Sequence, residues 1–187
     1  GTNWHNLFDI VRGADKAMHS NATNAETGPH SPARLSSFDS SGWSMGASTD
    51  VNGSGSTYVA WAWKAGGAAS SNSDGSITSS VSANASYGFS VVTWTGQSSG
   101  SATIGTGLSS APKFIIVKAR TGSVGWTVGH ESIGWTKRLK LNGTDAASTS
   151  SNYWNDTAPT SSVFTSGANN VNNTFVAYCW SEVAGFS

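Results

Sequence analysis

The sequence predicts an all-β protein, a sandwich or barrel of short strands. Three observations predict it. Short runs of aromatic and β-branched residues alternate with small or polar ones, a pattern typical of half-buried strands. Gly, Asn and Ser interrupt these runs at close and even intervals. Of the 187 residues only 11% are charged although nine are Trp, a composition that suits short strands better than long helices.

The clearest strand is predicted near the C-terminus, in the string NTFVAYCWSEVAGFS (residues 173–187). Apolar residues alternate there at period two, so the two faces carry different side chains. One face would carry Val176, Tyr178 and Trp180, and the other Phe175, Ala177 and Cys179. A very similar string, STYVAWAWKAGG, occupies residues 56–67 and is also predicted to be a core strand, with Val59, Trp61 and Trp63 in the matching places.

The other elements follow in chain order. Residues 12–19 could form a helical turn, and residues 70–85 form a Ser-rich segment with a turn signal at Asp74-Gly75 and a loosely paired strand. The run Phe114–Arg120 is the most apolar, and Pro112 is tolerable at the start of its strand. Further strands are predicted at 88–96, 102–105, 125–130 and 137–142, the last with Leu139 and Leu141 inward and Arg138 and Lys140 outward.

An internal duplication is predicted from these strings. Trp4 to Asn24 matches Trp126 to Ala146 at an offset of 122 residues, and the duplicated strand follows in each copy. The predicted division is a first repeat at 1–69, a Ser/Asn/Gly-rich connector at 70–86, and a second repeat at 87–187. The two repeats can also form one composite domain.

Composition and single residues exclude several function classes. A formal net charge of zero argues against nucleic acid or an anionic membrane surface as partner, since both require a basic surplus. No apolar run reaches the roughly 18 residues of a membrane span. Cys179 is the only cysteine, so no intrachain disulfide forms, and we expect a buried, unreactive thiol.

The ionisable residues do not form a recognisable catalytic or metal motif. The four histidines lack zinc-site spacing, and no cofactor is expected. His130-Glu131 is the one polar grouping that stands out, against the simpler alternative of an exposed strand end. Asp9 and Glu131 are repeat equivalents that could serve as paired carboxylates, but each is more simply an ion-pair partner, Asp9 of Arg12 and Glu131 of Arg138. We therefore expect no enzymatic activity.

The tryptophans supply the candidate binding residues. Trp43, Trp135 and Trp154 lie beside Ser, Asn and Asp, in segments whose composition is typical of loops. An exposed ring can stack on a sugar while amides and carboxylates bind its hydroxyls; equally, such a ring can plug the end of a sandwich. With His130 and Glu131, these three form the candidate ligand-binding set.

The strings SSFDSSGWSMG, STYVAWAWKAGG, ATIGTGLSSAPKFIIVKAR and NTFVAYCWSEVAGFS resemble a repeat family of virion proteins from marine bacteriophages, common in tail-fibre and appendage genes of cyanophages. The resemblance covers nearly the whole chain. It implies an all-β protein, an antiparallel β-sandwich of the jelly-roll or concanavalin A-like kind, displayed on a virus particle, and it supplies no catalytic residues. It also implies that the first repeat lacks its leading strand, because members of the family carry ahead of the first block a strand that matches residues 113–120 of the second.

The function expected from the resemblance is a structural and adhesive module of a phage appendage that binds a host-surface glycan. The alternatives are a purely structural fibre or capsid-decoration unit and a polysaccharide-degrading enzyme domain. A depolymerase would show paired carboxylates in a groove. An adhesin would show exposed Trp side chains without paired carboxylates, and a decoration unit would show neither, only a large apolar contact face. The expected partners are copies of the same chain, as a homo-oligomer, and other virion proteins; the expected location is the virion.

Overall fold

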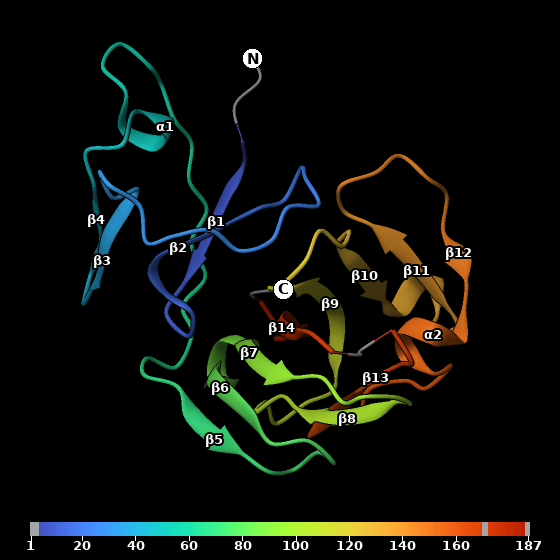
Figure 1. The fold of residues 1–187 in the computed structure, drawn as a ribbon. Coiled ribbons are helices and arrows are strands. Elements are labelled where there is room, and N and C mark those ends of the chain that lie inside the picture. The colour runs from blue at the N-terminus through green and yellow to red at the C-terminus, as the bar shows by residue number, and fades with distance from the viewer. Residues whose placement is uncertain (1–3, 170–171, 186–187) are drawn as a thin grey trace.

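A computed structural model describes residues 4–169 and 172–185. Its main feature is an eight-stranded antiparallel sheet with the order β12-β11-β10-β9-β14-β7-β6-β5 (Figure 1). Its strands are β5 (Ser70–Asn72), β6 (Ser79–Asn84), β7 (Phe89–Thr95), β9 (Pro112–Ala119), β10 (Thr127–His130), β11 (Lys137–Lys140), β12 (Ser148–Thr149) and β14 (Thr174–Ser181). Short 3-10 turns at Ala85–Tyr87 and Glu131–Ile133 precede β7 and follow β10.

Strand β14 lies at the centre of this sheet, although it is the last strand in chain order. It pairs antiparallel with β7 on one side and with β9 on the other. Both of its faces are buried: Phe175, Ala177 and Cys179 contribute to one core, and Val176 and Tyr178 to another. The alternation predicted from the sequence is therefore confirmed, with a packed layer on each side of the strand.

The first face of the sheet packs against a two-stranded sheet of β8 (Ala102–Gly105) and β13 (Val163–Ser166) and against the short helix α2 (Ser151–Trp154). Aromatic rings fill this core. Trp94 lies parallel to Phe175 and edge-on to Phe164, with ring centroids 5.3 and 5.6 Å apart. Such offset and edge-on contacts are the preferred geometries of aromatic pairs, so this layer joins the small sheet firmly to the main sheet.

The opposite face is covered by the N-terminal hairpin of β1 (Asn6–Asp9) and β2 (Gly13–His19). Met18 and Trp126 are fully buried in this second core. The indole Nε1 of Trp126 donates to the carbonyl oxygens of His19 and Ala22, at 2.9 and 3.1 Å. These bonds satisfy the indole and attach the end of the hairpin to the sheet.

A buried polar network connects the same hairpin to β14. The Tyr178 hydroxyl donates to Asp9 Oδ2 at 2.8 Å, and Arg12 donates to both Asp9 and the Tyr178 oxygen. Arg12 also forms an ion pair with Glu26, which Arg120 of the sheet binds through two nitrogens. Each charge has an opposite charge or a hydrogen-bond partner, which is the condition under which burial of charge is tolerated. The expected ion pair of Asp9 with Arg12 is confirmed.

Another hairpin projects from this body. It consists of β3 (Leu35–Asp39) and β4 (Gly42–Met45), followed by the short helix α1 (Thr49–Asn52). The ion pair between Arg34 and Asp50, 2.7 Å apart, joins the hairpin base to α1. In Figure 1 these elements form the upper-left part of the molecule, away from β8 and β13. Among the described residues no helix is long and apolar enough to cross a bilayer.

The predicted all-β class and antiparallel sandwich are thus confirmed, and most strands lie where the sequence places them. Residues 70–85, predicted to hold one loosely paired strand, supply β5 and β6 of the main sheet. Residues 12–19, predicted to contain a helical turn, instead contain the whole of β2, which pairs with β1. Packing of β2 over the second core outweighs the weak local preference of these residues for a helix.

The prediction of a core strand at 56–67 is wrong. Residues 57–69 are irregular, and the side chains of Val59 and Trp61 are 73% and 76% exposed. Trp63 and Trp180 do not occupy equivalent core positions: Trp180 is in β14, whereas Trp63 is half exposed and touches Trp180 edge-on. The physical reason is the absence of neighbours. The described residues contain no strand paired with this segment, whereas β14 has one on each side.

Residues 4–24, the first block of the predicted duplication, contain the hairpin of β1 and β2. Residues 126–146, at the predicted offset of 122, contain a second hairpin. β1 and β2 form one antiparallel pair, and β10 and β11 form another at the matching place. The repeat boundaries at 69/70 and 86/87 stay a prediction, as does the equivalence of the remaining blocks.

Candidate ligand-binding pocket

A hollow of about 520 Å³ lies between the main sheet and α2. Its apolar floor consists of Val117, Ala119 and Phe175, on β9 and β14. These residues belong to the first core, so the hollow is a place where that core opens to solvent. The size is within the range of pockets that hold small ligands, about 300–1,000 Å³.

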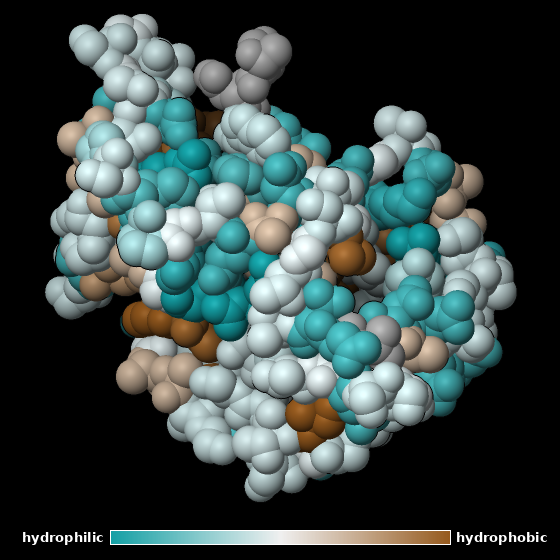
Figure 2. Space-filling view, viewed as in Figure 1, coloured by the Kyte–Doolittle hydropathy of each residue, from teal (hydrophilic) through white to brown (hydrophobic). Residues whose placement is uncertain are grey.

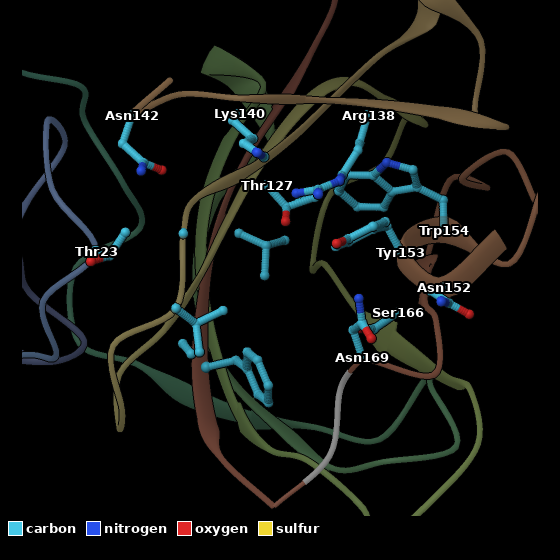
Figure 3. A pocket seen from close by; sticks show the side chains of 15 residues that line it. Thr23, Thr127, Arg138, Lys140, Asn142, Asn152, Tyr153, Trp154, Ser166 and Asn169 are labelled. Carbon is cyan, nitrogen blue, oxygen red and sulfur yellow. The ribbon is translucent and has the colours of Figure 1, made fainter. Parts of the chain in front are cut away.

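Polar side chains form the walls. Figure 3 shows the guanidinium of Arg138, the hydroxyl of Thr127 and the ring of Tyr153 directed at one open space, while Asn152 points away from it. The residues with amide, hydroxyl or cationic groups in the lining are Thr23, Thr127, Arg138, Lys140, Asn142, Asn152, Tyr153, Ser166 and Asn169. An apolar floor with convergent polar walls is the usual composition of a small-molecule site.

Helix α2 holds Tyr153 in position, although it is a single turn. The Ser150 hydroxyl caps its start by accepting from the backbone nitrogen of Asn152, and Asn155 ends it in the left-handed region at φ 51°. This turn directs Trp154 into the core, where it is 1% exposed, and leaves Tyr153 at the edge of the hollow. The Arg138 guanidinium carbon lies 3.8 Å from the centre of the Tyr153 ring, a close cation–π contact.

The electrostatics of the pocket are basic. Arg138 and Lys140 lie two residues apart on β11 and therefore on the same face. Lys140 donates to Asp145 at 2.9 Å, a hydrogen bond that holds the pKa of that exposed carboxyl below its ordinary value. Arg138 Nε is buried and has no hydrogen-bond partner among the residues that the structure describes. No Asp or Glu belongs to the described lining, so its charged side chains are the cations Arg138 and Lys140.

The three candidate tryptophans have different surroundings. Trp154 lines the pocket but is only 1% exposed and packs edge-to-face on Trp135 at 5.4 Å, so of the two alternatives it fills the core and is not an exposed, ligand-stacking ring. Trp135 is half-buried and packs against the first core. Gly129 provides the space for both rings, because a Cβ there would lie 2.5 and 2.7 Å from their carbon atoms. Trp43 is exposed on β4, opposite Phe38, and does not line the pocket.

The predicted polar grouping also differs from its expected form. His130 Nδ1 accepts from the backbone nitrogen of Ser132 and so caps the 3-10 turn that follows β10. Glu131 is exposed and forms its ion pair with Lys113, so the expected pair with Arg138 is wrong. Neither His130 nor Glu131 lines the pocket. Asp9 is buried on the opposite side of the sheet, so the two carboxylates do not form a pair.

Sequence reasoning missed the residues that build the pocket. Arg138 and Lys140 were expected on the outer face of their strand, and Asn152 and Tyr153 were not singled out. The alternation Lys-Arg-Leu-Lys does indicate a shared face for Arg138 and Lys140. Nothing local indicates that α2 and residues 166–169 lie over that face, because their position depends on distant pairing.

Within residues 4–169 and 172–185 no group of three or more His, Cys, Asp or Glu side chains could hold a metal ion. No curated protein and no solved structure matches the chain. Over residues 1–187, however, it matches the sequence profile of a family described as Domain of unknown function (DUF7483), and the chain belongs to that family.

Proposed function

We propose that this chain is a non-catalytic binding module that holds an acidic saccharide in the pocket between β11 and α2. The observation that carries the proposal is the Arg138–Tyr153 pair at the edge of a hollow lined with amides and hydroxyls. An aromatic ring can support a sugar face, and hydroxyl and amide groups bind sugar hydroxyls. The guanidinium of Arg138, which is directed into the open space, supplies a charged donor that can bind a carboxylate, sulfate or phosphate substituent.

Binding rather than hydrolysis is proposed because glycoside hydrolysis ordinarily requires two carboxyl groups on either side of the scissile bond. The described lining of the pocket contains no carboxylate. The two carboxylates singled out in the sequence serve other purposes, since Asp9 is fully engaged in the buried network and Glu131 pairs with Lys113.

The biological setting that we propose is an adhesive appendage of a phage virion, in which such a module attaches the particle to a host-surface polysaccharide. Support comes from the resemblance of the sequence to virion proteins and from the all-β sandwich. The surface in view in Figure 2 is mostly hydrophilic or near neutral, with hydrophobic residues in a few separate patches. This surface suits a displayed module with a local binding site.

The test is titration of residues 1–187 with oligosaccharides that contain uronic acid or sulfate, against neutral oligosaccharides of the same length, by calorimetry at two salt concentrations. We expect acidic ligands to bind at least about tenfold more tightly and more weakly at high salt, because exposed charges are screened. Arg138→Gln should reduce affinity at least about tenfold, the range of one charge-assisted hydrogen bond.

The matched control is Lys137→Gln, which removes a charge from the same strand at an exposed position outside the lining. Its affinity should equal that of the wild type. If both variants lost affinity equally, the loss would come from the general surface charge and not from the pocket. The absence of binding to every saccharide tested would refute the proposed function.

A further inference from the structure

The segment Thr57–Ala65 combines the sequence of a core strand with the environment of an exposed coil. Val59 and Trp61 are 73% and 76% exposed, and Tyr58 and Trp63 are half exposed. Figure 1 shows the segment as part of the long teal-to-green coil that connects α1 with β5. A contiguous run of large apolar side chains in water is uncommon on a soluble domain, and it marks a surface that another molecule covers.

The backbone of the segment is equally unpartnered. Residues 57–66, all of them described, make no backbone–backbone hydrogen bond and belong to no sheet. The segment is nevertheless fixed at both ends. The Tyr58 hydroxyl accepts from the backbone nitrogen of Gly53 and donates to the carbonyl of Thr49, and the Trp63 ring packs on Phe89 and Trp180. Between these two attachments lies an apolar stretch that is long enough for a strand, with its donors and acceptors open.

The chain itself shows what such a sequence does when it has neighbours. β14 has the same pattern, with Val176, Tyr178 and Trp180 in the places of Val59, Trp61 and Trp63. β14 forms antiparallel pairs along both edges, and opposite its Tyr178 and Trp180 the strand β9 presents Ile116 and Phe114. The missing neighbour of residues 57–65 is therefore a strand with the chemistry of β9.

We propose that residues 57–65 are a docking strand that pairs antiparallel with an apolar β-strand of a partner polypeptide. The main-chain groups of the segment supply the hydrogen bonds, and Val59, Trp61 and Trp63 supply one apolar face. This is strand addition to an open edge, in which backbone bonds give affinity and alternate side chains give specificity. The surface is distinct from the saccharide pocket, and the proposal does not depend on it.

The partner strand is apolar and carries few charges. The segment holds one charged side chain, Lys64, and no carboxylate, so an acidic or strongly basic strand has nothing to pair with along most of its length. A strand such as β9, with branched apolar residues at its centre, matches the aromatic face of the segment.

The test uses the 1–187 chain and a synthetic peptide with the sequence of residues 112–120, extended by two serines at each end for solubility. The peptide contains no Trp, so a shift of tryptophan emission reports on the protein alone. We expect a saturable blue shift and at least a tenfold slowing of amide hydrogen exchange at residues 58–64. A scrambled peptide of the same composition should cause neither change.

Two variants separate strand pairing from simple adhesion to exposed rings. Ala60→Pro removes a backbone donor from the segment and leaves every aromatic side chain in place, so it should abolish the exchange protection. Trp61→Ser should weaken peptide binding at least tenfold. Trp43→Ser, which removes an exposed ring from β4, is the matched control and should bind as the wild type does.

Three results would overturn the proposal. Peptide binding without protection of residues 58–64 would show that the peptide attaches elsewhere. Unchanged binding by Ala60→Pro would exclude main-chain pairing. A dimer that forms without peptide in sedimentation velocity, and that Ala60→Pro dissociates, would identify a second copy of this chain as the occupant instead.

Discussion

Lys118 provides a quantitative test of the packing on the β1–β2 side of the sheet. Its side chain is completely buried on β9, opposite Val176, and its Nζ donates to the neighbouring carbonyl of Ala119 at 2.7 Å. Burial lowers the pKa of Lys118 from 10.5 to about 8, because the charged ammonium loses its hydration. The perturbation is Lys118→Met, which keeps the length of the side chain and removes the charge.

The magnitude follows from the pKa difference. Each pKa unit corresponds to about 1.4 kcal/mol, so the charged form of Lys118 destabilises the folded state by about 3 kcal/mol at pH 7. A group whose folded pKa is below its unfolded pKa favours folding only when it is deprotonated. Between pH 8 and 10.5 Lys118 binds more protons in the unfolded chain than in the folded one. The free energy of unfolding therefore rises with pH across that window.

The assay is urea denaturation followed by tryptophan fluorescence, at four pH values from 7 to 10.5, for the wild type and Lys118→Met. Subtraction of the two curves removes the titration of all other groups. At pH 7 the variant should be more stable by about 2 kcal/mol, since the lost hydrogen bond offsets about 1 kcal/mol. The wild type should gain about 3 kcal/mol relative to the variant by pH 10.5. Parallel curves over this range would refute the buried, desolvated ammonium.

Three further predictions concern other parts of the fold. Tyr178→Phe removes a donor to the buried Asp9 carboxylate and should lower the free energy of unfolding by about 1–3 kcal/mol in urea titration; no change would mean that water replaces the hydroxyl. Cys179, buried and with its pKa raised to about 12 by burial, should react with a thiol reagent only after denaturation, and fast labelling of the native protein would contradict its position. Gly129→Ala should cost about 1–3 kcal/mol in thermal or urea unfolding, because its Cβ would overlap two indole rings, whereas Gly42→Ala has open space and should be neutral; similar effects of the two would contradict the packing.

The contrast between two similar strings shows how far sequence reasoning reaches. Period-two alternation correctly predicted β14 and the faces of its side chains, because alternation follows from strand geometry alone. The same alternation at 57–65 predicted a strand that the structure does not contain. Local pattern fixes which side chains share a face; whether a strand forms depends on the neighbours that supply its hydrogen bonds.

The candidate pocket illustrates a second limit. Trp154 lies in a Ser- and Asn-rich segment whose composition is typical of a loop, yet a one-turn helix with a Ser cap directs it into the core. Arg138 and Lys140 alternate with Leu139 in a way that predicts their common face, but not that the face is covered. The cover comes from α2 and residues 166–169, whose placement depends on the pairing of β13 with β8, about 60 residues earlier in the chain.

The central position of β14 has a consequence for the order in which the chain can fold during synthesis. β7 and β9 are made long before residues 174–181, and each has an open edge until those residues leave the ribosome. Tyr178, one of the sheet's attachment points for the N-terminal hairpin, arrives in the same step, 169 residues after its partner Asp9. A nascent chain that stalls before Thr174 therefore holds two incomplete half-sheets, whose open edges favour aggregation, and a hairpin that lacks its contact to β14.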